Sequence, residues 1–287
     1  MKILLLGKNG QLGWELERTL SPLGQVTGMD YAELDLNDFD ALRAAVRQLQ
    51  PGLIVNASAY TNVDKAESEP ELANAINGTV PGILAEEASR LKASLIHYST
   101  DYVFDGTQDH PYTEAAITRP LGTYGSSKLA GERAIEAVGG AYMILRTAWV
   151  YSLRGNSFVN KVLQWSRQNE TLRVVDDQVS NPTWARLLAE VTAQVLARGS
   201  EIVSQKRGIY HLAGGGYASR FEWAREILKL DLKPAEQVTK HLVPASTRDF
   251  PTPAVRPLFS ALNCACFENT FGLRLPDWRE ALRMAMS

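Results

Sequence analysis

The first thirteen residues of the chain, Met1 to Gly13, read MKILLLGKNGQLG. The apolar run at residues 2–6 predicts a buried strand, and glycines follow it at positions 7, 10 and 13. Glycine allows a tight turn after the strand and lets a phosphate approach the backbone without meeting a Cβ. The free N–H groups at the start of a helix at residues 11–20 favour an anion at the same place. The segment therefore predicts a dinucleotide site in which Gly7, Gly10 and Gly13 shape the pyrophosphate loop.

Short apolar runs alternate with helical patterns through the first half of the chain. This alternation predicts a parallel sheet with crossover helices, and the continuous Val/Ile/Leu runs indicate strands that are covered on both faces. The expected strands are residues 2–6, 26–29, 53–56, 94–99 and 142–146. The expected helices are residues 11–20, 38–49, 71–90 and 123–138. The predicted fold class is α/β, with a Rossmann-type doubly wound parallel sheet.

The pattern becomes less regular after about residue 150. Helices are expected at residues 157–167, 185–197, 220–230 and 276–286, and strands at 172–175 and 208–213. Four of the chain's prolines fall between residues 244 and 257, which indicates turns. We expect residues 1–150 to form a dinucleotide-binding Rossmann domain, with strands that return to its sheet from about 172–213. Residues 151–287 are then mainly a smaller, interleaved substrate-binding lobe.

Composition limits the partners of the chain. Its 287 residues carry a formal net charge of −2, with 45% hydrophobic residues, so neither nucleic acid nor a membrane surface is an expected partner. Two cysteines, Cys264 and Cys266, are too few for a disulfide framework, and the histidines show no spacing typical of metal ligands. The N-terminal apolar run is too short for a signal peptide, and no run is long enough for a membrane span. A cytoplasmic protein that binds small molecules or another subunit is expected.

Asp30 ends the second expected strand, twenty residues after Gly10. An acid at this position typically accepts hydrogen bonds from ribose hydroxyls, and it favours NADH because the 2′-phosphate of NADPH meets a like charge. A solvated aspartate at the end of a strand is the alternative. The small residues that follow the third strand, at 56–60 (NASAY), leave room for the adenine or the nicotinamide ribose. The choice between NADPH and NADH stays open.

Tyr124 and Lys128 lie four residues apart on one expected helix, and therefore on one face of it. An ammonium beside a phenol stabilises the phenolate and lowers the pKa of the phenol. Thr100 follows the fourth strand, at the edge of the sheet where ligands bind, and its hydroxyl can hold a substrate carbonyl. The alternatives are a solvated helix face for the pair and turn capping for Ser99 and Thr100. Together with the glycine segment, the three residues predict carbonyl reduction.

These residues resemble the extended short-chain dehydrogenase/reductase family. A fuller set of motifs is similar to its dTDP-4-dehydrorhamnose reductase branch: residues 63–67 (VDKAE), 99–106 (STDYVFDG), 146–151 (RTAWVY), 177–178 (DQ), 182–183 (PT), 251–254 (PTPA) and 256–257 (RP). The resemblance implies reduction of the C4 carbonyl of dTDP-4-dehydro-L-rhamnose with NADPH or NADH. It implies that Tyr124 supplies the proton, Lys128 lowers the pKa of Tyr124, and Thr100 holds the carbonyl.

The same resemblance implies two sets of binding residues. The substrate set is Val63, Thr100, Asp101, Tyr102, Phe104 and Trp149, with Arg256 as a candidate for the diphosphate or for a salt bridge. The dinucleotide set is Gly10, Gln11, Leu12, Asp30, Asp35, Leu36, Ala59, Tyr60, Thr61 and Tyr98, besides Tyr124 and Lys128. Some members of the family dimerise through magnesium held by glutamates. Arg186 stands at one matching position, so no metal is expected, and the chain is expected to be a monomer or a homodimer.

Two other functions remain open at this point. A sugar-nucleotide dehydratase or epimerase of the same superfamily is one alternative. Dehydratases usually have an Asp-Glu pair after the threonine, whereas Tyr102 follows Asp101 here. A non-catalytic regulatory subunit, similar to that of methionine adenosyltransferase, is the other alternative. The intact set of Thr100, Tyr124 and Lys128 favours an enzyme.

Overall fold

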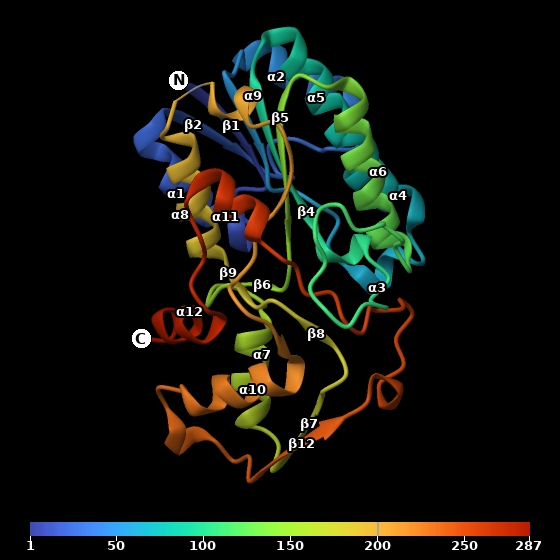
Figure 1. The fold of residues 1–287 in the computed structure, drawn as a ribbon, viewed down its shortest axis with the longest axis vertical. Coiled ribbons are helices and arrows are strands. Elements are labelled where there is room, and N and C mark those ends of the chain that lie inside the picture. The colour runs from blue at the N-terminus through green and yellow to red at the C-terminus, as the bar shows by residue number, and fades with distance from the viewer. Residues whose placement is uncertain (200) are drawn as a thin grey trace.

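Six parallel strands form the central sheet of the computed structural model, which describes residues 1–199 and 201–287 (Figure 1). They are β1 (Lys2–Leu6), β2 (Gln25–Met29), β3 (Leu53–Asn56), β4 (Ser94–Thr100), β5 (Ala141–Thr147) and β10 (Gly208–His211). Their order across the sheet is β10-β5-β4-β3-β1-β2. The chain runs from β1 to β2 on one side and then crosses to β3 on the other. The order therefore reverses between β1 and β3, where ligands of such sheets typically bind.

Helices cover both faces of this sheet (Figure 1). One face packs against α1 (Gln11–Leu20), α8 (Ala185–Leu196), α9 (Ile202–Gln205) and α11 (Ala265–Phe271). The other face packs against α2 (Phe39–Leu49), α5 (Val80–Leu91) and α6 (Thr123–Val138). The central strands β1 and β3 are almost entirely apolar and buried, as expected for a sheet with two covered faces, whereas the edge strand β2 has no fully buried residue.

A second lobe lies beyond the carboxyl ends of the strands (Figure 1). It contains α7 (Phe158–Ser166), α10 (Arg220–Lys229) and α12 (Trp278–Ala285), which pack around the buried Trp223 and Trp278. β7 (Thr171–Val175) pairs in parallel with β12 (His241–Ala245) at the edge of this lobe. Two further pairs are β6 (Val150–Tyr151) with β9 (Thr183–Trp184), and β8 (Val179–Ser180) with β11 (Ala218–Ser219).

The α/β class and the parallel sheet are confirmed, while one expected strand pairing is wrong. Of the two strands expected to return to the sheet, only β10 does so, whereas β7 pairs with β12. The side chains of β7 alternate between buried and exposed, which suits a strand with one covered face. The domain division near residue 150 stays a prediction. Three elements after that residue, α8, β10 and α11, belong to the sheet or pack on it.

The expected helix at residues 71–90 is interrupted. It consists of α4 (Pro70–Asn74), a π-helical turn at Ala75–Thr79 and α5. Pro81 stands in the first turn of α5, where proline is tolerated, and it has no N–H to donate to the preceding π-helical turn. Turns of this kind often occur at functional sites. This one places the Asn77 side chain against the backbone of Tyr60, which lies on the loop after β3.

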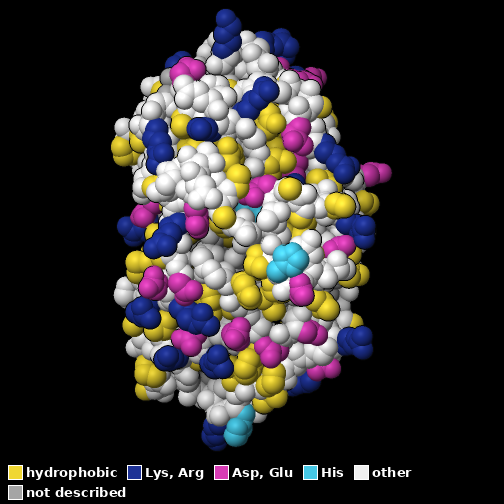
Figure 2. All heavy atoms as spheres, in the orientation of Figure 1, with side chains coloured by type: hydrophobic (Ala, Val, Ile, Leu, Met, Phe, Trp, Pro, Cys, Tyr) yellow, Lys and Arg dark blue, Asp and Glu magenta, His cyan; other side chains and the backbone are white. Residues whose placement is uncertain are grey.

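The surface carries both signs of charge. Figure 2 shows Lys and Arg side chains interspersed with Asp and Glu over the face drawn. Within the residues described, no helix combines the length and the apolar character that a membrane span needs.

Candidate active site

The glycine-rich loop turns tightly between β1 and α1. Gly7 has a φ of 83°, which glycine adopts without strain, and its N–H donates to the carbonyl of Met29 at 2.9 Å. A Cβ on Gly7 would lie 2.8 Å from the Ser58 backbone nitrogen. A Cβ on Gly13 would overlap the carbonyl oxygen of Gly7. The glycines are therefore required by close packing of the loop, which brings the N-terminus of α1 to the switch point of the sheet.

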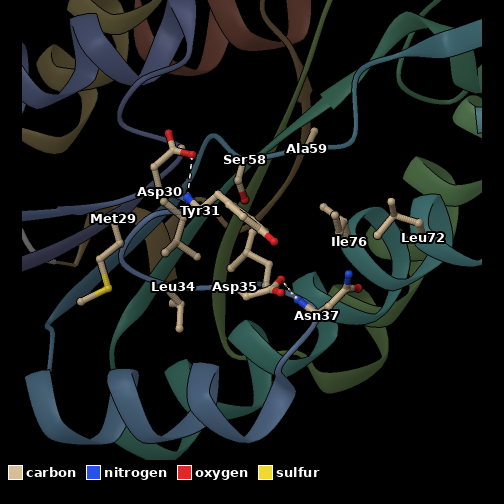
Figure 3. A pocket seen from close by; sticks show the side chains of 13 residues that line it. Met29, Asp30, Tyr31, Leu34, Asp35, Asn37, Ser58, Ala59, Leu72 and Ile76 are labelled. Atoms are coloured by element: carbon tan, nitrogen blue, oxygen red, sulfur yellow. Dashed lines mark hydrogen bonds between the residues drawn. The ribbon is translucent and has the colours of Figure 1, made fainter. Parts of the chain in front are cut away.

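Two adjoining cavities open beside this loop, and Gly7, Asp30, Ser58 and Ala59 line both. The larger has a volume of about 740 Å³ and is lined by predicted dinucleotide residues: Gly7, Gly10, Gln11, Leu12, Asp30, Ala59, Thr61, Tyr98, Tyr124 and Lys128. The smaller, of about 380 Å³, contains Asp35 and Leu36 and has apolar walls from Leu34, Leu72 and Ile76 (Figure 3). Two predicted residues line neither cavity: Gly13 packs under Gly7, and the Tyr60 hydroxyl donates to Glu69 at 2.6 Å.

Asp30 is held rigidly at the border of the two cavities. Its Oδ2 accepts from the Asn9 N–H at 2.9 Å and its Oδ1 from the Tyr31 N–H at 2.8 Å (Figure 3). Glu33 accepts from the N–H of Asp30 at 3.0 Å and forms an ion pair with Lys8 at 2.7 Å. The carboxylate of Asp30 and the ammonium of Lys8 therefore both lie close to the place expected for the adenosine ribose.

Tyr124 lies in the first turn of α6, with its ring edge-on to Tyr102 at 5.6 Å between centroids. Burial raises the pKa of the Tyr124 phenol, and a hydrogen bond with Thr100 lowers it. Tyr124 also lines a small cavity on the other side, together with Val63, Tyr102 and Ala254. Its side chain therefore stands between the dinucleotide cavity and the loops of the second lobe.

Lys128, one turn further along α6, is buried and turned toward β4. Its Nζ donates to the carbonyl oxygen of Tyr98 at 2.6 Å and lies 3.2 Å from Nε2 of His97. Burial lowers the pKa of the Lys128 ammonium to about 8, against the opposing charge of Glu132. In this structure Thr100, not Lys128, lowers the pKa of Tyr124. The expected effect of Lys128 on the phenol therefore stays a prediction.

Thr100 and Asp101 form a hydrogen-bonded corner after β4. The Thr100 hydroxyl accepts from the Tyr102 N–H at 3.1 Å and donates to the Asp101 carboxylate at 3.1 Å. The Asp101 carboxylate also accepts from the hydroxyls of Ser180 at 2.9 Å and Ser260 at 2.5 Å. Thr100 therefore caps this turn, as its alternative role predicts. The Asp101 carboxylate is buried and accepts from three hydroxyls, so it holds Thr100 in place and does not make the predicted substrate contact.

A buried ion pair anchors α6 to the sheet behind this corner. Arg146 donates two hydrogen bonds to Glu132, at 3.0 and 2.6 Å, and the Ser99 hydroxyl donates to the same carboxylate at 2.5 Å. Both charged side chains are almost inaccessible to solvent, at 3% and 1% exposed. The pair fixes the helix that carries Tyr124 and Lys128 relative to the strand ends.

The other predicted substrate residues occupy different surroundings. Phe104 is fully buried and stacked on Tyr112 at 4.3 Å, so the predicted pocket contact is wrong and the ring packs in the core instead. Trp149 has a φ of 40°, and its ring lies 3.7 Å from the guanidinium of Arg220. Arg256 forms an ion pair with Asp64 at 2.7 Å and also lines a cavity of the second lobe, so the expected salt bridge is present and the diphosphate contact stays a prediction.

Several cavity residues were not predicted. Arg154 and Thr147 line the larger dinucleotide cavity, and both lie in or after the RTAWVY motif, which marks the region. A separate cavity of about 750 Å³ in the second lobe is lined by Arg220 and Arg256 and by the aromatic rings of Phe158, Trp165 and Phe250. No periodicity identifies this group, because its members come from distant loops and helices.

A glycine loop at the switch point of a parallel sheet, with a buried Tyr–Lys pair across the cavity, defines a nicotinamide-dependent oxidoreductase of the short-chain type. The family model described as RmlD substrate binding domain matches residues 1–287. The dTDP-4-dehydrorhamnose reductase of Escherichia coli K12 is 41% identical, over 100% of this chain and 97% of that protein. This chain belongs to the dTDP-4-dehydrorhamnose reductase family, which confirms the expected resemblance.

Solved structures agree with this assignment. The crystal structure of a dTDP-4-dehydrorhamnose reductase from Clostridium acetobutylicum has a TM-score of 0.92 and 35% identity, covering 100% of this chain and 98% of that one. The Bacillus anthracis reductase, in complex with NADP, has a TM-score of 0.89 and 32% identity, covering 99% and 98%.

Proposed function

We propose that this protein reduces the C4 carbonyl of dTDP-4-dehydro-L-rhamnose to dTDP-L-rhamnose with NADPH or NADH. The observation that carries the proposal is the position of Tyr124, which lines both the dinucleotide cavity and the small cavity next to the second lobe. A side chain in this position reaches a cofactor on one side, and the small cavity on its other side, of about 10 Å³, has room for about one water and must widen to admit the sugar. The names of the curated relatives supply the substrate.

The residues around the larger cavity fit a nicotinamide dinucleotide. A Cβ on Gly7 or Gly13 would clash with the backbone of the loop. Because both residues are glycines, the loop turns tightly and leaves the N-terminus of α1 accessible to a pyrophosphate. Arg154 adds a positive charge to the same wall. The Thr147 hydroxyl is buried without a partner among the described residues and lies on the cavity lining, so a polar ligand would satisfy it. When bound, the cofactor supplies the hydride that is added to C4.

Tyr124 is proposed as the proton donor. Because burial raises the pKa of its phenol, Tyr124 stays protonated near neutral pH and is ready to donate. The alkoxide that forms at C4 is a much stronger base than a phenolate, so the proton moves toward the sugar oxygen. Thr100 is proposed to hold the carbonyl by turning its single hydroxyl proton from Asp101 to the substrate oxygen. Lys128 is proposed to stabilise the phenolate and to hold the nicotinamide ribose.

The second lobe is proposed to bind the nucleotide part of the substrate. Its cavity presents two guanidinium groups, Arg220 and Arg256, which suit a diphosphate, next to aromatic rings that suit a thymine. Val63 and Tyr102 line the small cavity on the sugar side. We accordingly propose residues 1–150 as the main cofactor-binding part and residues 151–287 as the main substrate-binding part.

The test is to mix the protein with dTDP-4-dehydro-L-rhamnose and NADPH, then with NADH, and to follow loss of the reduced nicotinamide absorbance. The rate of nicotinamide consumption should fall by a factor of about 10²–10⁴ in Tyr124→Phe, which removes the proton donor. Tyr142→Phe, at the far end of β5, is the matched control and should keep the wild-type rate. No consumption by a folded protein that binds dinucleotide contradicts the substrate, and a fully active Tyr124→Phe contradicts the mechanism.

The oligomeric state stays a prediction of a monomer or a homodimer, which light scattering measures. Location in the cytoplasm also stays a prediction. Among the described residues, no three His, Cys, Asp or Glu side chains are grouped so that they could bind a metal ion. We propose that the enzyme works without a metal, so its rate should be unchanged by a chelator.

A further inference from the structure

His97 lies in the middle of a buried chain of three side chains behind the proposed active site. Its Nδ1 is 3.1 Å from the Asn56 side-chain nitrogen, and its Nε2 is 3.2 Å from Nζ of Lys128. All three residues are at most 2% exposed to solvent. None of the roles proposed above uses the side chain of His97 or that of Asn56.

The orientation of the Asn56 amide is fixed by its other partner. Its oxygen accepts from the N–H of Ser58 at 3.1 Å and from the Ser58 hydroxyl at 2.6 Å. A backbone N–H can only donate, so the amide oxygen must face Ser58 and the amide NH₂ must face His97. Nδ1 of His97 therefore accepts a hydrogen bond and carries no proton.

A neutral imidazole with an unprotonated Nδ1 carries its proton on Nε2. Burial, with the nearby Lys128, holds the pKa of His97 well below its usual value, so the ring is neutral. The Nε2–H group then points at Nζ of Lys128. It can donate only to an amine with a free lone pair, whereas a charged ammonium would place two donors face to face.

We propose that His97 is a positioning residue that acts through Lys128: Asn56 fixes its tautomer, and in that tautomer it disfavours the charged form of Lys128 in the cofactor-free enzyme. The Tyr98 carbonyl, 2.6 Å from Nζ, accepts a hydrogen bond from either form of the amine. Because a charged donor forms the stronger hydrogen bond, this carbonyl favours the ammonium and in part opposes the effect of His97.

The other ionisable groups around Lys128 do not remove this bias. Glu132, one turn along α6, favours the charged amine, but it is paired with Arg146 of β5. Glu87 of α5 is paired with Arg47. The buried or half-buried titratable groups that remain on α6, β4 and the elements packed against them are Tyr98, Asp101, Tyr102, Tyr124, Tyr142 and Asp64, of which Asp64 is paired with Arg256 and Asp101 is bonded to hydroxyls. The others on these elements are exposed to solvent: Lys65, Glu71, Glu86, Arg90, Arg133 and Glu136.

One consequence rests on the proposed function, in which Lys128 holds the nicotinamide ribose. Hydroxyl oxygens accept hydrogen bonds from an ammonium, so a bound ribose favours the charged form that His97 disfavours. Dinucleotide binding near the pKa of Lys128 should therefore be accompanied by proton uptake.

The first experiment reads the tautomer of the wild-type, cofactor-free protein. Nitrogen-15 NMR of histidine-labelled protein distinguishes a protonated Nε2 from a protonated Nδ1, and the His97 signal is assigned by its loss in His97→Gln. We expect the proton on Nε2. A proton on Nδ1 overturns the proposal without the need for any variant to fold.

The second experiment titrates Lys128 by carbon-13 NMR of lysine-labelled protein, with the signal assigned by its loss in Lys128→Arg. Asn56→Asp offers an acceptor to Nδ1 and reverses the tautomer, so the midpoint of Lys128 should rise by about one pH unit or more, tenfold in proton affinity. Thr192→Val, which removes the hydroxyl partner of Tyr98, loosens the same region and should leave the midpoint unchanged. An unchanged midpoint in Asn56→Asp overturns the proposal.

A double variant separates the tautomer from the charge that Asn56→Asp introduces. In a His97→Gln background the substitution should add little, because the imidazole that transmits it is gone. An equal shift in both backgrounds overturns the role of His97. Calorimetry of NADP⁺ binding in buffers of different ionisation enthalpy then measures proton uptake. If uptake is absent although the NMR results hold, the proposed place of Lys128 at the ribose is wrong and the His97 proposal stands.

Discussion

Replacing Glu132 by glutamine should lower the free energy of unfolding by about 3–5 kcal/mol, the usual cost of removing one partner from a buried ion pair. Glu132 and Arg146 are 1% and 3% exposed, and two hydrogen bonds join them at 2.6 and 3.0 Å. Glutamine keeps one oxygen but leaves the guanidinium charge buried and uncompensated. The Nη1 atom of Arg146 already has no hydrogen-bond partner among the described residues, so no other acceptor nearby replaces the lost carboxylate oxygen.

The assay is urea unfolding, followed by circular dichroism, of the wild type, Glu132→Gln, a control, a double variant, and the two single variants Glu132→Met and Arg146→Met that compose the double. Glu190→Gln is the matched control, because it breaks a pair with Arg186 that is 37% and 58% exposed and should cost at most about 1 kcal/mol. The double variant Glu132→Met, Arg146→Met removes both charges together and should be more stable than Glu132→Gln alone, since no buried charge is left without a partner.

Two results would refute this reasoning. A loss below about 1 kcal/mol in Glu132→Gln would mean that water or a rearrangement solvates Arg146. A double variant as unstable as the sum of its single variants would mean that packing, not charge, carries the effect. Because the Glu132 charge raises the pKa of Lys128, the glutamine variant should also lower that pKa further.

Three further outcomes are expected. Gly13→Ala places a Cβ into the carbonyl of Gly7, so dinucleotide affinity measured by calorimetry should fall at least about tenfold while the protein stays folded. Asp64→Ala releases Arg256 and the N–H of Ala254, so the loop over the small cavity should loosen and KM for the sugar nucleotide should rise more than kcat falls. If catalysis needs the charged amine of Lys128, whose pKa lies at about 8, kcat/KM should fall above about that pH, and a rate that stays flat to about pH 10 would contradict it.

Most of the sheet was predictable because its strands are short, apolar and separated by turn residues. The observed bounds of β1 and β3 match the expected ones, and the other strands differ by a residue or two at their ends. The sequence pattern did not predict strands that form only because a distant segment pairs with them. β12 contains Pro244 and is mostly exposed, so neither apolar periodicity nor propensity indicates a strand, yet it pairs with β7. The π-helical turn before α5 continues the apolar helical pattern and changes only the hydrogen bonding, which periodicity does not report.

The site divides in the same way. Residues held by a local motif were predictable: Gly7, Tyr124 and Lys128 stand where a loop or one helix face puts them. Residues whose role depends on partners distant in sequence were not predictable. Asp101 looks like a pocket residue in its motif, but Ser180 and Ser260 bind its carboxylate from segments 79 and 159 residues away.

The contacts of Lys128 show why such partners matter for the chemistry. A Tyr–Lys spacing of four residues predicts an ammonium beside a phenol, and that reading treats the charge of the lysine as given. In the folded protein the charge depends on His97 of β4 and on Asn56 of β3, which the sheet brings within hydrogen-bonding distance of each other. The end of β4 and the loop after β3 also line the dinucleotide cavity. Ligand binding and the charge of Lys128 are therefore linked through neighbouring strand ends. The spacing of the motif thus selects the residues, while the tertiary contacts of Lys128 determine the pH range in which it is charged.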